Sequence, residues 1–111
     1  MDRLFDDTSF QADFVGNGPF SIVGSVTVFT DDLGNRVLRL DENFQTERGG
    51  QLTLILRSQS GEVVNLGDLQ RLDGVQDYLL PDQIDLNTFD QVQVWDEQLN
   101  TDRGNAFLTA G

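Results

Sequence analysis

The sequence contains neither cysteine nor histidine, and these two absences exclude much chemistry. Without cysteine the chain can form no disulfide, no thiolate nucleophile and no cysteine-ligated metal site. Without histidine it lacks the commonest general base, and both the Ser-His-Asp and the Cys-His catalytic arrangements are excluded within this chain. We therefore expect a protein that is not an enzyme and that holds no haem, iron–sulfur cluster or other resident cofactor.

Lysine is also absent, so all seven basic side chains are arginines, and the formal net charge is −12. A surface of this charge repels phosphate backbones and anionic lipid headgroups, which disfavours nucleic-acid and membrane binding. The partners that remain are cations, basic proteins and neutral ligands. An acidic surface that only maintains solubility explains the same charge.

No apolar run approaches the roughly 20 residues that cross a bilayer, so we expect no membrane insertion. The first eight residues, MDRLFDDT, have neither the basic nor the apolar region of a signal peptide. Two interpretations stay open. The protein is cytoplasmic, or this chain follows a leader or another domain.

The hydrophobic pattern has a period of two, which is typical of β-strands. Strands are expected at residues 20–28, 37–44, 52–57, 63–69, 75–80, 92–96 and 105–110, with a single helical turn at 85–89. Turns rich in glycine, asparagine and aspartate separate them. This spacing predicts an all-β fold, either an antiparallel β-sandwich or a flattened barrel, of about 8 to 10 strands. Residues 1–18 are expected to form an acidic arm that packs partly on the domain, and residues 19–111 the domain itself.

Asp96 is the residue that departs from this pattern. In a regular strand it would point to the same side as Val92 and Val94, where an acid is out of place. Trp95 has the opposite parity and is expected on the other face. A buried carboxylate without a partner would cost several kcal/mol or stay protonated.

Several motifs then recur in an order that resembles the DM13 domain family, over residues 18–110. They are GPF at 18–20, the strand around Gly24, LRLDENF at 38–44, GGQLTLIL at 49–56, LGDL at 66–69, GVQDYLLP at 74–81, DL at 85–86, VQVW at 92–95 and GNAFL at 104–108.

The resemblance implies a compact all-β domain, usually extracytoplasmic and often attached to other domains. It also implies a part in redox or electron-transfer assemblies, through a cysteine directly after the tryptophan of the V-x-V-W motif. In this chain Asp96 occupies that position, and Arg103 stands where the family tends to have an aromatic residue. A carboxylate cannot cycle electrons as a thiol does. The resemblance therefore implies an accessory or interaction domain that lacks the redox cysteine and binds a protein partner or a neighbouring domain.

Three roles stay open for Asp96: an ion pair with Arg103, a solvated acid at a frayed strand end, or a ligand-binding group. The alternative function is a calcium- or ligand-binding module of the adhesion type. The first candidate calcium ligands are the oxygen-rich turn residues Asp31, Asp32 and Asn35. A second, weaker set comprises Asp77, Asp82, Asp85 and Asp90. Turn and capping roles explain both sets more simply.

Overall fold

The computed structural model describes residues 9–81 and 84–110, and within these ranges all regular structure is β-strand. No helix in these ranges has the length and hydrophobicity to span a membrane. The strands are β1 (Phe10–Asp13), β2 (Val15–Gly16), β3 (Ile22–Val23), β4 (Ser25–Thr30), β5 (Arg36–Leu40), β6 (Gln45–Thr46), β7 (Leu52–Arg57), β8 (Val63–Asp68), β9 (Gln76–Leu79), β10 (Gln91–Asp96), β11 (Thr101–Phe107) and β12 (Thr109–Ala110).

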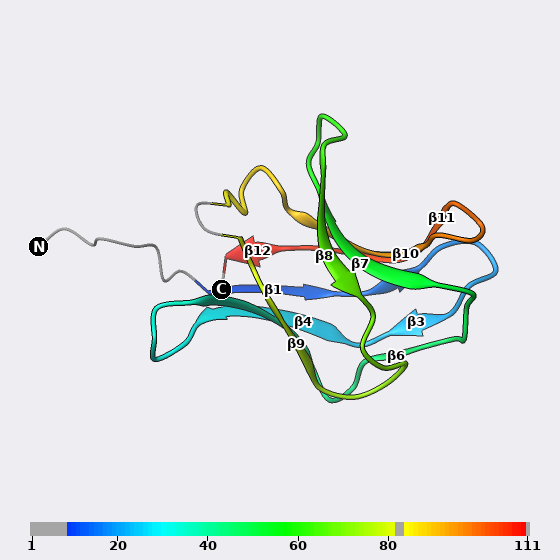
Figure 1. Cartoon of the computed structure of the whole chain (residues 1–111), viewed down its shortest axis with the longest axis horizontal. Helices are drawn as coiled ribbons and strands as arrows, with labels where there is room; N and C mark the ends of the chain where they lie inside the picture. Colours follow the sequence, from blue (N-terminus) through cyan, green and yellow to red (C-terminus); the bar gives the residue numbers. More distant parts are fainter. Residues whose placement is uncertain (1–8, 82–83, 111) are drawn as a thin grey trace, which may run out of the picture.

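Two five-stranded antiparallel sheets form the two layers of a sandwich (Figure 1). The first sheet has the order β12-β1-β4-β5-β9 and the second the order β2-β11-β10-β7-β8, while β3 and β6 form a separate two-stranded ribbon. The predicted all-β sandwich is confirmed. The sheets are open, so the flattened barrel that the sequence left possible is not formed by the described residues.

The core lies between the sheets and follows the alternation of the sequence. Inward-facing residues such as Val26, Leu38, Leu54 and Val92 are fully buried. Their neighbours in sequence point outward, as strand geometry requires. On β10, Asp96 is as fully buried as the two valines that share its side of the strand, as the strand parity predicted.

The chain passes between the two sheets at two buried corners. Phe14 links β1 of the first sheet to β2 of the second, and Leu108 links β11 back to β12. Both side chains are buried, and both backbone amides find acceptors: the Phe14 N–H donates to the Gly24 carbonyl at 2.8 Å and the Leu108 N–H to the Asp90 carbonyl at 2.7 Å. The corners therefore bury hydrophobic surface without leaving buried polar backbone unpaired.

Strand formation begins earlier than the sequence analysis predicted. β1 and β2 lie within the expected arm of residues 1–18, and β1 pairs with both β4 and β12. Phe10 and Phe14 belong to the core, as expected of the arm's aromatic residues, whereas Phe5 lies outside the described residues. A boundary at residue 19 would thus separate two strands from the sheets they complete.

Gly24 divides the long strand expected at residues 20–28 into β3 and β4. Its φ of +119° is accessible to glycine and strained for other residues, and it sits against the backbone of Phe44. A Cβ at this position would lie 2.4 Å from the Phe44 Cα. The glycine therefore permits both the bend and the close approach of the two chain segments.

Replacing Gly24 with alanine is expected to lower the free energy of unfolding by about 3 kcal/mol or more, because backbone strain adds to a steric clash. Gly67 is the matched control. Its φ is +113°, but nothing lies within 4 Å of a Cβ there. Alanine at Gly67 should cost only the backbone strain, about 1–2 kcal/mol. Urea unfolding measures both variants, and equal losses would contradict the clash with Phe44.

Candidate functional site

A β-bulge between β10 and β11 directs Arg103 into the protein. Val94 lies opposite Gly104, but the next residue, Trp95, lies opposite Asp102, so Arg103 is the extra residue of the bulge. In a regular strand Arg103 would share the outward side of Asn105. The bulge instead sends Asp102 outward, where its carboxylate accepts hydrogen bonds from Gln93 and Asn105.

Asp96 and Arg103 form a buried ion pair. The Arg103 Nε donates to Oδ2 of Asp96 at 2.9 Å, and its Nη2 lies 2.8 Å from the same oxygen. The Asp96 side chain is 0% exposed and the Arg103 side chain is 8% exposed. Of the roles left open by the sequence, the structure therefore has the ion pair and not the solvated strand end.

The second oxygen of Asp96 is also occupied. Its Oδ1 accepts a hydrogen bond of 2.9 Å from the Leu99 backbone N–H, in the turn that joins β10 to β11. Among the described residues, no buried side-chain nitrogen or oxygen lacks a hydrogen-bond partner. The desolvation of this carboxylate is therefore offset by a charge-assisted pair and by a backbone amide.

The guanidinium of Arg103 fits a narrow space between an aromatic ring and a glycine. Its Cζ lies 4.3 Å from the centroid of the Phe20 ring, which is a cation–π distance. On another side, a Cβ added to Gly49 would come within 3.1 Å of Nη2. Sequence reasoning missed both neighbours, because each is far from Arg103 in the chain and neither is charged.

The pKa of the Asp96 carboxyl is lowered from its usual value. The largest cause is the hydrogen bond from the Leu99 amide. Burial raises the pKa, and the hydrogen bond and charge of Arg103 lower it again. Asp96 is thus held in its ionised form, in which its oxygens are hydrogen-bond acceptors.

Trp95 faces away from this pair. It lies on the outer side of the second sheet, where the Arg57 guanidinium carbon is 5.4 Å from its ring centroid. Arg57 also donates to the Gln93 side chain at 2.8 Å. Of the three residues singled out at the family motif, the structure brings Asp96 and Arg103 together and places Trp95 on the opposite face.

Among the candidate calcium ligands, Asp31 and Asp85 serve as turn and capping groups, and Asp77 forms an ion pair with Arg39. The Asp31 side chain accepts hydrogen bonds from the Leu33 and Asn35 backbone N–H groups, both at 2.9 Å, as in an Asx turn. Asp85 caps the start of the turn at residues 85–89. Its side-chain Oδ1 accepts a hydrogen bond of 2.9 Å from the Asn87 N–H. Within residues 9–81 and 84–110 no three carboxylates gather as a metal site would require; Asp82 lies outside these ranges.

Removing either partner of the ion pair is expected to destabilise the domain by about 3–5 kcal/mol, because the other charge would remain buried and unpaired. Suitable variants are Asp96→Leu and Arg103→Met. The double variant should recover a large part of the loss, since it leaves no buried charge. Urea unfolding of all four proteins gives the coupling between the two residues. Additive losses in the double variant would contradict the pair.

The pH dependence of stability follows from the lowered pKa. The stabilisation by ionised Asp96 is complete above the unfolded-state pKa of about 3.9 and is lost as the pH falls through the lower folded-state pKa. The difference in unfolding free energy between the protein and its Asp96→Asn variant should therefore be constant near neutral pH and shrink below about pH 4. A difference that stays constant into strong acid would contradict an ionised Asp96.

The sequence was compared with family models, curated proteins and solved structures. The family model described as "Electron transfer DM13" matches residues 14–108. No curated protein and no solved structure gives a match. The matched range runs from the first buried corner, at Phe14, to the second, at Leu108, and includes both residues of the ion pair. The chain belongs to the DM13 family.

Proposed function

We propose that this chain is a non-catalytic member of the DM13 family that serves as an accessory or interaction domain and carries no electrons itself. The observation that carries the proposal is the buried ion pair of Asp96 and Arg103. It occupies the position after the tryptophan of the V-x-V-W motif, where the family resemblance implies a cysteine. A redox thiol is therefore replaced by a charge that is fully engaged by its neighbours.

The chemistry of the remaining side chains supports the proposal. A carboxylate has no accessible oxidation step comparable to the thiol–disulfide couple. The chain has no cysteine or histidine to hold a haem or an iron–sulfur cluster. Its single tyrosine, Tyr78, is buried, and burial raises the pKa of its hydroxyl, which favours the neutral form. The resemblance further favours an extracytoplasmic location and a protein partner or neighbouring domain.

Direct electrochemistry tests the absence of electron transfer. The natively purified protein should have a flat visible spectrum and give no reversible wave in protein-film voltammetry. The variant Asp96→Cys combined with Arg103→Tyr restores the thiol and an aromatic residue. With glutathione disulfide as the oxidant, its thiolate should form a mixed disulfide and release one glutathione thiol, a reaction that the unmodified protein cannot undergo. A wave from the unmodified protein would overturn the proposal. A double variant that remains folded and forms no mixed disulfide would show that a thiol at this position does not take part in redox exchange.

Calcium titration of the same preparation tests the alternative of a cation-dependent adhesion module. We expect no binding heat in calorimetry and no change in melting temperature, because the Asp31 side chain is already used in its turn. A saturable heat, with a rise in melting temperature, would support the alternative instead.

A further inference from the structure

The outer face of the first sheet carries a polar groove. A hollow of about 500 Å³ lies over β12, β1 and β4. Five of its lining side chains belong to two neighbouring cross-strand rows, Thr109–Gln11–Thr27 and Asp13–Ser25. Phe107, which is 58% exposed, also lines this hollow.

The groove continues toward β5. A second hollow, of about 460 Å³, shares Ser25 and Asp41 with the first and is lined in addition by Arg39, Glu42, Asn43 and Val75. From β12 to β5 is three strand spacings, or about 14 Å. This length matches about four residues of an extended peptide. The shape therefore suits a chain segment that crosses the strands better than it suits a compact ligand.

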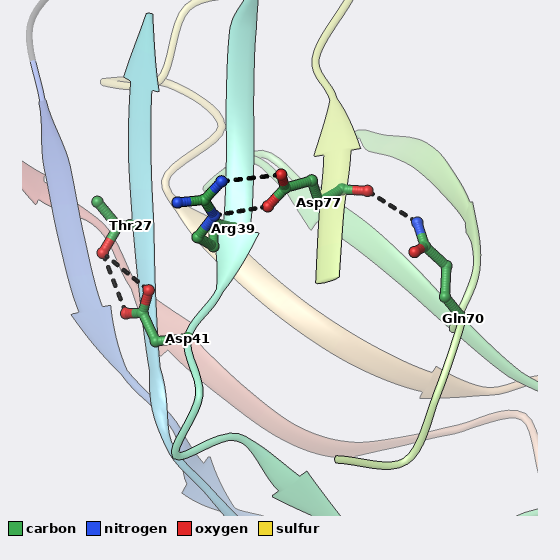
Figure 2. A network of polar contacts seen from close by, with 5 residues as sticks. All are labelled: Thr27, Arg39, Asp41, Gln70 and Asp77. Atoms are coloured by element: carbon green, nitrogen blue, oxygen red, sulfur yellow. Dashed lines mark hydrogen bonds and ion pairs between the residues drawn. The ribbon is translucent and has the colours of Figure 1, made fainter. Parts of the chain in front are cut away.

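Hydrogen bonding leaves the centre of the groove rich in acceptors. The Thr27 hydroxyl donates to the Asp41 carboxylate at 3.0 Å (Figure 2), and the Ser25 hydroxyl donates to the same carboxylate at 2.8 Å. The Ser25 hydroxyl also lies 3.2 Å from the Asn43 side-chain oxygen, a second acceptor. Because both hydroxyls act as donors to these acceptors, their oxygens keep lone pairs for a ligand. An incoming group must therefore supply the donors.

The charges of the groove also favour a ligand that is a cationic hydrogen-bond donor. Asp13, Asp41 and Glu42 contribute three negative charges. The cation in the lining, Arg39, makes a two-pronged pair with Asp77, with N–O distances of 2.8 and 3.0 Å (Figure 2), and its Cζ lies 4.8 Å from the Phe29 ring centroid. Arg39 is thus neutralised, and the groove attracts cations within a protein of net charge −12.

The long edges of the sheets are protected against strand addition, which leaves the faces for docking. On β9, the Gln70 side chain donates to the Asp77 carbonyl at 2.7 Å and so occupies a backbone acceptor of that edge strand (Figure 2). On β8, a bulge at Asn65–Gly67 interrupts the ladder, and the Gly67 N–H donates to the Asn65 side chain at 2.7 Å. Such features are known to prevent edge-to-edge pairing.

We propose that this groove binds an extended, arginine-bearing segment of a partner protein. Guanidinium groups supply several donors in one plane, which suits the carboxylates of Asp13 and Asp41, and they stack on exposed aromatic rings such as Phe107. The inference rests on the proposed role as an interaction domain and names the chemistry of the partner. Apolar and anionic ligands fit poorly, because the lining is polar and negatively charged.

Isothermal titration with a hexa-arginine peptide tests the proposal. The protein should bind one peptide saturably. The variant Asp13→Asn/Asp41→Asn should weaken binding about tenfold or more, because it removes both carboxylates that line the first hollow. The matched control is Asp32→Asn/Glu62→Gln, which changes the net charge equally outside the groove and should weaken binding less than about twofold. Melting temperatures confirm that all variants are folded. Asp13→Asn alone leaves the Ser25–Asp41–Thr27 contacts intact and should still weaken binding measurably.

Three results would overturn the proposal. Equal weakening by the groove variant and the control would show that only net charge attracts the peptide. Spermine binding as tightly as the peptide would identify a small cation as the occupant. Absence of saturable binding would remove the site altogether. None of these results would produce a redox wave or a visible chromophore, so failure here is distinct from failure of the proposed function.

Discussion

The free energy required to bury the Asp96 carboxylate is the constraint on which this end of the sandwich depends. A carboxylate with no solvent exposure requires a countercharge and hydrogen bonds to both oxygens. Arg103 supplies the countercharge only because the bulge in β11 turns it inward. The arginine in turn needs the face of Phe20 and the missing side chain of Gly49. Three segments that are distant in the sequence, the β10–β11 hairpin and the segments of Phe20 and Gly49, thus meet at one buried charge.

Membership in the DM13 family gives this pair its significance. The matched range folds as an all-β sandwich, and Asp96, which follows Trp95 on β10, carries a charge that Arg103 neutralises. Replacing a buried ion pair by hydrophobic residues of similar volume is often neutral or stabilising, so the pair by itself is weak evidence of added net stability. The core of this sandwich is thus complete around a charged pair, and the chain contains no thiol.

Much of the fold was predictable from the alternation of side chains, because burial on one face of a strand imposes a period of two. The inward positions Val26, Leu40 and Leu54 follow from that pattern. The ion pair was one of three interpretations, and the bulge that forms it was not predicted. Its local signal is Asp102 followed by Arg103 and Gly104, where the alternation breaks. Which of two adjacent polar residues turns inward depends on Phe20 and Gly49, and one-dimensional periodicity does not contain such contacts.

The pairing of β1 with β12 has a mechanical consequence. Phe10 lies opposite Ala110, so β1 and β12 run antiparallel, and the start of β1 is adjacent to the end of β12. A force that pulls on both ends would load the bonds between these strands one after another, as in a zipper, and not all together in shear. Tension transmitted through flanking sequence would therefore open the sandwich at this corner first. The buried ion pair lies in the opposite sheet and would be disrupted only later.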